Sequence, residues 1–419
     1  MGAAAMIGDD ERAGAGTGGW DETQLTFGTE AGRFHAHSYY DIPVMDAAGA
    51  RLVGVQTTFV ERQPGPDDAV TVGVVATDSP GSWTPLATTT AWSWQQGPMA
   101  QWLPDDRVIW NDRAAPDDGA AFVARVADPG GDRPSLTLPR PVYAVMPDGT
   151  AGLSIDMARL DRLRPGYGYA APAAPQAHDL VPAPADDGVW RVPLDGGAPT
   201  LILSLAEAVE GLRRRMTLRE RIVHRFGRFR YWFNHLKIAP DGARFTAKLR
   251  WRRPGGPWSG RMGVSLTCGT AGTGAAGGDL RLLGRATSHV IWLGSDRLYY
   301  YDEIARRVVI RADAAPQGHE VGRIAPDRLR TNVHLRHLPP GTGDPDALVY
   351  DTPYREDPIL WRTGPDGRDP VRIAAYANHV PPRGPFRCDL HPCPDATGRR
   401  IAVTSMRDGG RQIYLLTRR

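Results

Sequence analysis

Four histidines recur at matching places in a repeated unit of this sequence. They are His235, His289, His334 and His391, and each lies early in a short apolar stretch followed by a turn rich in Pro, Asp or Gly. Asp389 precedes His391 by two residues, which places both side chains on one face of an extended strand. Imidazoles and a carboxylate that converge on one point can bind a divalent metal, such as manganese or calcium, or transfer protons. The pattern therefore predicts a site of one of these two kinds.

A structural role for these histidines is the alternative. Any single histidine could bind water or the backbone of a neighbouring repeat, and for one residue alone that interpretation is favoured. The corresponding place in two earlier repeats holds Gln96 (or its neighbour Gln95) and Tyr143, so we expect both side chains to face substrate. Arg387 could clamp a carboxylate through two hydrogen bonds. With 48 arginines in the chain, an ion pair between repeats is its simpler role.

The repeat itself predicts the fold. Each unit is a short strand, a turn and an apolar strand, and a period of roughly 45–55 residues with several strands is typical of a propeller blade. Seven copies begin at Tyr39, Gln95, Arg140, Phe233, Ser288, Asn332 and Arg387. The sequence thus predicts an all-β, seven-bladed β-propeller over residues 21–419. The first strand of each blade lines the central channel, so the histidines should gather at its mouth.

Three further features concern the organisation of the chain. The interval from Arg140 to Phe233 is about twice the others, which predicts an insertion at about 160–225, with one helix over Leu201–Arg221. Residues 1–20 are small and polar and are predicted to be disordered. The last strand, Arg411–Thr417, should complete a blade together with residues from the N-terminal end, because a ring of blades leaves no free sheet edge.

Composition excludes several classes of protein. The chain has 419 residues and a net charge of +3, which argues against a nucleic-acid partner held by electrostatics. No apolar run approaches the ~18 residues of a membrane span, so no membrane partner is expected. Three cysteines do not make a disulfide scaffold, and they fit a reducing, cytoplasmic location. Nothing in the sequence indicates an oligomeric state. All but two of the 50 basic residues are arginines; the lysines are Lys237 and Lys248.

The C-terminal half resembles the oligogalacturonate lyases, seven-bladed propeller enzymes of pectin breakdown. The resemblance rests on TSHVIWLGSDRLYYYD, NVHLRHLPPG and DLHPCPDATGRRIAVTSMRDGGRQIYLL, and more loosely on NHLKIAPDG. Similar segments also occur in TolB-like propellers. The resemblance implies that His289, in the SHVIW segment, is the general base. It also implies a metal ligand at His334 and further ligands in FRCDLH. From its place in the repeat, we expect His235 to be a second catalytic residue.

The last of these segments departs from the family pattern. That family carries Gln-x-x-His-x-His, and His391 matches its second histidine, whereas Asp389 stands for the first and Phe386 for the glutamine. A carboxylate can replace an imidazole as a ligand, but a phenyl ring cannot. The family's histidine in a His-Glu-Gly-Pro-like segment falls at Leu249. The resemblance implies a lyase that cleaves an acidic oligosaccharide by β-elimination. Two alternatives stay open: a propeller that binds saccharide or protein without turnover, and a hydrolase or epimerase that uses the same histidines.

Overall fold

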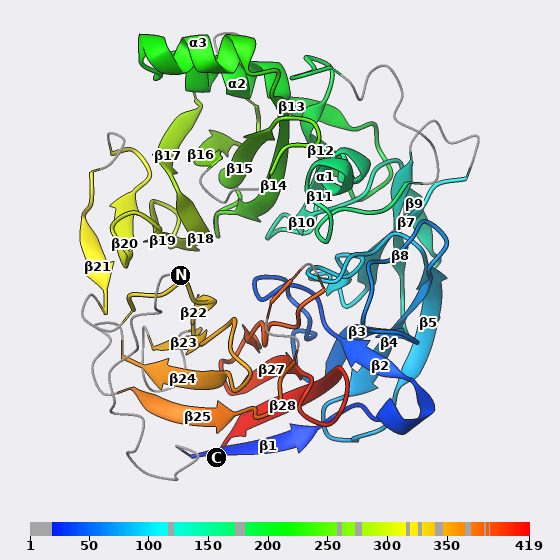
Figure 1. Ribbon diagram of the computed structural model, residues 1–419. Coiled ribbons are helices and arrows are strands. Elements are labelled where there is room, and N and C mark those ends of the chain that lie inside the picture. The colour runs from blue at the N-terminus through cyan, green and yellow to red at the C-terminus, as the bar shows by residue number, and fades with distance from the viewer. Residues whose placement is uncertain are drawn as a thin grey trace.

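Seven four-stranded antiparallel sheets stand around a central channel (Figure 1). This arrangement, seen in a computed structural model, confirms the predicted all-β, seven-bladed propeller. The structure describes residues 19–419 except 116–120, 172–180, 258–261, 273–278, 316–318, 326–328, 340–346, 365–369, 381–382 and 385. No helix in the described part of the chain is long and apolar enough to cross a membrane.

Each of the first four blades has four strands in order from the channel outward. They comprise β2 (Phe34–Ala36), β3 (Arg51–Thr57), β4 (Val70–Ala76) and β5 (Thr84–Thr89); β6 (Gln101–Trp102), β7 (Val108–Arg113), β8 (Phe122–Ala127) and β9 (Leu136–Leu138); β10 (Ala144–Val145), β11 (Ala151–Ser154), β12 (Gly188–Pro193) and β13 (Thr200–Ser204); and β14 (Arg230–Ile238), β15 (Arg244–Arg252), β16 (Gly263–Gly269) and β17 (Arg281–Arg285).

The remaining three blades complete the ring. They comprise β18 (Thr287–Leu293), β19 (Arg297–Asp302), β20 (Arg307–Ala312) and β21 (Gly322–Ile324); β22 (Leu335–His337), β23 (Leu348–Asp351), β24 (Ile359–Thr363) and β25 (Val371–Ala375); and β26 (Cys393–Pro394), β27 (Arg400–Ser405), β28 (Gln412–Arg418) and β1 (Trp20–Gln24). A short 3-10 helix, Thr29–Ala31, links β1 to the first blade.

The ring closes through strand β1, which pairs with β28 at the outer edge of the seventh blade. Trp20 lies opposite Arg418 in this pair, and Gln24 lies opposite Tyr414. The prediction that residues from both ends of the chain share one blade is therefore confirmed. The predicted disorder of residues 1–20 falls almost entirely outside the described residues. Trp20 itself is buried and begins β1, so the predicted boundary lies slightly too late in the chain.

The turns that end the inner strands explain the repeat. In Pro-Asp-Gly turns such as 147–149 and 240–242, Gly149 and Gly242 have positive φ angles of 69° and 74°. A residue without Cβ adopts this conformation without steric cost. The turn then reverses the chain into a buried second strand, for example β11 or β15. The repeated sequence signal is thus the signal for an inner-strand hairpin.

The helices differ from the prediction. The segment Leu201–Arg221 is not one helix: its first residues belong to β13, and the remainder forms α2 (Leu205–Arg213) and the start of α3 (Leu218–Phe226). Ser204 and Thr217 each begin a helix with a capping box, which pairs them with Glu207 and Glu220. These two helix starts were not predicted.

The predicted insertion at 160–225 is also divided in two by strands β12 and β13 of the third blade. One excursion carries α1 (Met157–Leu163) and lies between β11 and β12. The other carries α2 and α3 and lies between the third and fourth blades. The doubled interval is therefore two separate additions to one ordinary blade.

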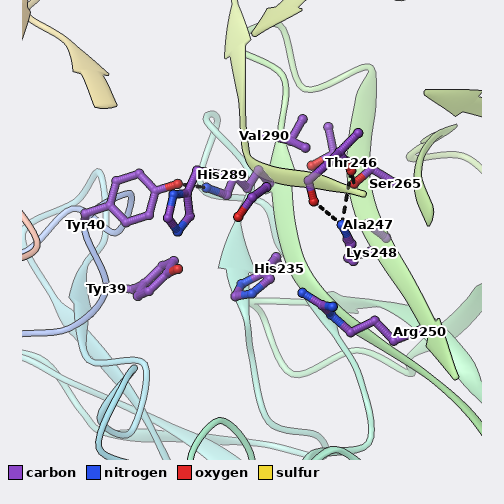
Figure 2. Close-up of a pocket in the computed structure, with 13 residues that line it drawn as sticks. Tyr39, Tyr40, His235, Thr246, Ala247, Lys248, Arg250, Ser265, His289 and Val290 are labelled. Atoms are coloured by element: carbon purple, nitrogen blue, oxygen red, sulfur yellow. Dashed lines mark hydrogen bonds between the residues drawn. The ribbon is translucent and has the colours of Figure 1, made fainter. Parts of the chain in front are cut away.

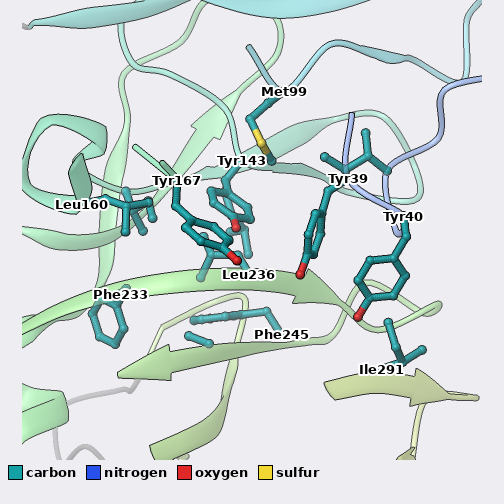
Figure 3. Packing of buried hydrophobic residues seen from close by; sticks show 14 of the residues in the cluster. Tyr39, Tyr40, Met99, Tyr143, Leu160, Tyr167, Phe233, Leu236, Phe245 and Ile291 are labelled. Atoms are coloured by element: carbon teal, nitrogen blue, oxygen red, sulfur yellow. The ribbon is translucent and has the colours of Figure 1, made fainter. Parts of the chain in front are cut away.

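The hydrophobic core runs between the faces of neighbouring sheets and reaches the channel. There, aromatic side chains from different blades gather, among them Tyr39, Tyr143 and Tyr167 (Figure 3). Tyr39 and Tyr40 come from the segment between β2 and β3, which leaves the first blade and enters the channel instead of continuing the strand.

Candidate functional site

Three of the four predicted histidines have a left-handed backbone. The φ angles of His235, His289 and His391 are 56°, 50° and 49°, which is uncommon for residues other than glycine. In β14 and β18 the pairing with the next strand shifts at this point, so His235 and His289 are each part of a β-bulge. A bulge re-aims a side chain, and here the imidazoles meet inside the channel. Met99 has the same conformation in the second blade and was not predicted.

The four imidazoles lie close together around two tyrosine rings. The ring centroids of His334 are 4.4 Å from those of His289 and 4.7 Å from those of His391. Tyr39 stacks on His235 at 5.5 Å and contacts His391 at 4.6 Å. Strands β14 and β18 and the segments that lead into β22 and β26 therefore bring together all four residues that the sequence singled out.

Three side chains in this cluster could hold a metal ion. Ligand atoms of His334, Asp389 and His391 all lie within 4.8 Å of one another, and all three residues are buried. His334 Nε2, His391 Nε2 and both carboxylate oxygens of Asp389 make no hydrogen bond to the described residues. Buried polar atoms are nearly always paired. Here the two imidazole nitrogens and Asp389 Oδ1 have no hydrogen-bond partner among the described residues, and Asp389 Oδ2 has an ion pair with Arg387, which is the pattern expected of ligands. The donor set fits a divalent cation.

Asp351 fixes the orientation of one ligand. The His334 ring contacts both Asp351 oxygens through Nδ1, at 2.8 and 3.1 Å, and the His334 backbone N–H donates to the same carboxylate at 3.0 Å. Both side chains are fully buried. A carboxylate behind Nδ1 leaves Nε2 free and raises its basicity, as in many metal sites. Sequence reasoning missed Asp351 because it lies on the second strand of its blade.

His289 is held in one tautomer. Its Nδ1 lies 2.8 Å from the backbone carbonyl of Val333, and a carbonyl can only accept a hydrogen bond. The proton is therefore on Nδ1, and Nε2 carries the lone pair. Burial and the neighbouring His334 hold the pKa of His289 well below its ordinary value, so the ring is neutral at pH 7. This is the state that a general base requires.

His235 rests on two residues that were predicted to bind substrate. The hydroxyl of Tyr143 accepts a hydrogen bond from the His235 backbone N–H at 3.0 Å and another from the Gln96 side chain. Gln96 is completely buried. Both residues support the bulge, and neither lines the cavity described below. Tyr143 lines a second hollow that also includes Lys237, and substrate binding by Gln96 and Tyr143 stays a prediction. Burial, with Arg164 nearby, lowers the pKa of His235 well below its ordinary value.

Arg387 lies on the other side of the metal-binding candidates. Its Nε is 2.9 Å from Asp389 Oδ2, and its Nη2 donates to the hydroxyl of Tyr167 at 3.2 Å. Arg164 stacks over the Tyr167 ring at 3.9 Å. These two arginines outweigh burial, so the pKa of Tyr167 lies below its ordinary value. The excursion that contains α1 thus delivers an unusual tyrosine to the site, and sequence reasoning gave it no role.

A narrow cavity adjoins His235 and His289 and is lined by cations (Figure 2). Its volume is about 20 Å³, which is room for about one water molecule. Lys248 and Arg250, from neighbouring positions on one face of β15, are only 4% and 7% exposed. Lys237 lies at the same cavity, 3.1 Å from Asp41, and burial lowers its pKa to about 8. Among the described residues that line the cavity, none carries a carboxylate.

Both lysines of the chain are therefore at this site. Lys248 donates to the backbone and side-chain oxygens of Thr287, which are neutral partners. Burial, with Arg250 close by, lowers the pKa of Lys248 well below its ordinary value. In a chain with 48 arginines, the two lysines could have been recognised as exceptional, because an ammonium is a compact point charge on a flexible stem, unlike the planar guanidinium of arginine.

Comparison with known proteins supports the fold. No family model matches the chain, and no curated protein matches its sequence. Among solved structures, the chain is similar to an oligogalacturonate lyase in complex with manganese, with a TM-score of 0.56 and 15% identity over 95% of this chain and 93% of that one. It is also similar to the oligogalacturonate lyase of Vibrio parahaemolyticus, with a TM-score of 0.57 and 13% identity over 94% of this chain and 93% of that one. The chain has the propeller fold of these lyases at a large sequence distance.

Proposed function

We propose that this propeller is a lyase that cleaves a uronate-containing oligosaccharide by β-elimination, with His289 as the general base. The observation that carries the proposal is the fixed tautomer of His289. Its Nε2 lone pair is available beside a buried cavity whose charged wall residues are cations. The similarity in fold to two oligogalacturonate lyases supports the choice of reaction.

The reaction removes the proton on C5 of the uronate, next to its carboxylate. His289 Nε2 takes this proton, the C–H electrons form the C4–C5 double bond, and the glycosidic C4–O bond breaks with its electrons leaving on oxygen, which then takes up a proton. Negative charge builds up on the carboxylate as the proton leaves. Buried cations aimed at that charge stabilise it strongly, because little water screens them. Lys248 and Arg250 are the residues we assign to this role.

The second cationic element is a divalent metal, which we propose is held by His334, Asp389 and His391. Bound there, a metal would supply positive charge to polarise the uronate carboxylate. Asp351 keeps His334 Nε2 directed at the ligand group, and Arg387 compensates the charge of Asp389 from the other side. Manganese is the first ion to test, because one of the similar structures is a manganese complex; calcium is the second.

The test is product formation. Purified protein with Mn²⁺ and trigalacturonate should form an unsaturated uronate, which absorbs in the ultraviolet. His289→Ala should lower kcat by about 10²–10⁴-fold, the range expected for a general base. His319→Ala is the matched control, since His319 is an exposed histidine outside the site. Absence of product from the wild type, or full activity of His289→Ala, would contradict the proposal.

A second experiment tests Lys248 and Arg250, the cations assigned to the uronate carboxylate. Arg250→Gln and Lys248→Met should each raise KM for trigalacturonate about tenfold or more, the value of a lost charge-assisted hydrogen bond. Arg253→Gln, an exposed arginine three residues further along, should leave KM unchanged. Thermal melting of each variant shows whether it is folded. A folded variant with unchanged KM would remove Lys248 and Arg250 from substrate binding.

One observation favours a second candidate function. Tyr39 and Tyr40 occupy the centre of the histidine ring, with Tyr40 bonded to Lys237 at 2.9 Å. A channel filled in this way suits a propeller that binds an acidic saccharide without turning it over. Calorimetry with digalacturonate separates the two functions: binding without any unsaturated product would establish the binding protein in place of the lyase.

A further inference from the structure

Helix α3 lies at the outer edge of the propeller, far from the channel (Figure 1). Contacts of Glu220 and His224 attach one side of it to the fourth blade, including packing of the His224 ring on Trp251 at 5.0 Å. Glu220 forms an ion pair with Arg285, and His224 Nδ1 lies 2.7 Å from the hydroxyl of Tyr231. None of its nine residues is buried.

The apolar side chains of α3 face away from the protein. Leu218, Ile222 and Phe226 are 73%, 50% and 72% exposed. At about 100° per residue they fall within about 80° of one another on the helix surface, opposite Glu220 and His224. A surface helix ordinarily turns its apolar stripe toward the core, as α2 does with Leu205, Val209 and Leu212. The orientation of α3 is therefore inverted.

Arginines border this apolar stripe. Residues 213–230 contain eight arginines and a single acidic residue, Glu220. Arg219 and Arg225, which flank the stripe, are exposed and form no ion pair with the described residues. The surface of α3 thus combines exposed Leu, Ile and Phe with a dense positive charge.

We infer that α3 is a docking element for an anionic lipid surface. Phospholipid headgroups would neutralise the arginines, while Leu218, Ile222 and Phe226 would enter the boundary between headgroups and acyl chains, as amphipathic basic helices do. A second copy of the chain would place arginines against arginines. Nucleic acid would satisfy the arginines but leave the apolar stripe in water.

This inference does not depend on the proposed lyase activity. It differs from the expectation that the protein has no membrane partner. That expectation rested on the lack of a spanning segment, and an interfacial helix binds a membrane without one.

Co-sedimentation with lipid vesicles tests the inference. The full chain should bind vesicles of phosphatidylserine and phosphatidylcholine and bind pure phosphatidylcholine at least tenfold more weakly. The double change Ile222→Ser with Phe226→Ser, and the double change Arg219→Gln with Arg225→Gln, should each weaken binding to the anionic vesicles about tenfold or more. Ile304→Ser is the matched control, because Ile304 is 71% exposed and belongs to the loop between β19 and β20.

Three results would overturn the inference. The first is no binding of the wild type to anionic vesicles in low salt. The second is an equal loss of binding in Ile304→Ser and in the α3 variants. The third is binding to an acidic protein or to duplex DNA, removed by the arginine changes, with none to vesicles. Because α3 buries none of its residues, all variants should keep the wild-type melting temperature, and that measurement accompanies the assay.

Discussion

The histidines where the ring closes differ from those at the mouth of the channel. At the closure, His35 contacts Gln412 through Nδ1 at 3.0 Å and Gln56 through Nε2 at 2.9 Å, so both ring nitrogens have protein partners. At the mouth, His289 and His334 each use only Nδ1, leaving Nε2 directed into the site. A buried histidine with both nitrogens bonded supports the structure. One with a single bonded nitrogen is oriented and still able to react.

The largest expected effect is on the free energy of unfolding, through His35 at the ring closure. Burial lowers the pKa of His35 to about 4, so its neutral form belongs to the folded state. The neutral His35 ring therefore contributes to the free energy of unfolding. The contribution is complete above pH 6.5 and is lost as pH falls toward 4, because the unfolded chain takes up a proton that the folded protein does not. It amounts to on the order of 3 kcal/mol. Urea unfolding at pH 7 and at pH 4 gives the loss of unfolding free energy between the two. This loss should be smaller by this amount in His35→Gln than in the wild type. An identical pH dependence in His35→Gln and wild type would show that His35 is not held neutral.

A smaller effect is expected at the mouth. Asp351→Asn should weaken metal binding by about 10–100-fold, the usual result of removing a carboxylate behind a metal-bound histidine. Titration with Mn²⁺ followed by calorimetry measures the change. His35→Gln should leave metal affinity unaltered, since it acts only on the closure. If Asp351→Asn binds metal as tightly as the wild type does, His334 is a structural histidine like His35. The difference between the closure and the mouth of the channel would then not hold.

The smallest effect should come from the support beneath His235. Tyr143→Phe removes the hydroxyl that bonds the His235 N–H and Gln96, at a cost of about 1 kcal/mol in unfolding free energy. Metal affinity should stay the same. A tenfold or greater change in KM for trigalacturonate would instead return Tyr143 to the substrate-binding role predicted from the sequence.

The sequence indicated the blades because each inner hairpin repeats its turn residues, and it indicated the four histidines because they keep one place in that repeat. Residues that do not share the histidines' place in the repeat were not predicted. Tyr39 and Tyr40 come from a segment that leaves its strand, Tyr167 comes from an excursion, and Asp351 and Lys248 lie on second strands. Their proximity to the histidines depends on the curvature of the whole ring, which no local pattern encodes.

The pairing of β1 with β28 also determines when the propeller can form. Arg419 and Asp21, which make an ion pair beside this seam, are 398 residues apart in the chain. During synthesis, six blades can assemble from consecutive residues, whereas the seventh has an unpaired edge on β28 until β1 joins it. Contacts between distant residues form slowly, and an open edge is prone to pair with other chains. The seam is therefore the step at which this protein is most exposed to misassembly.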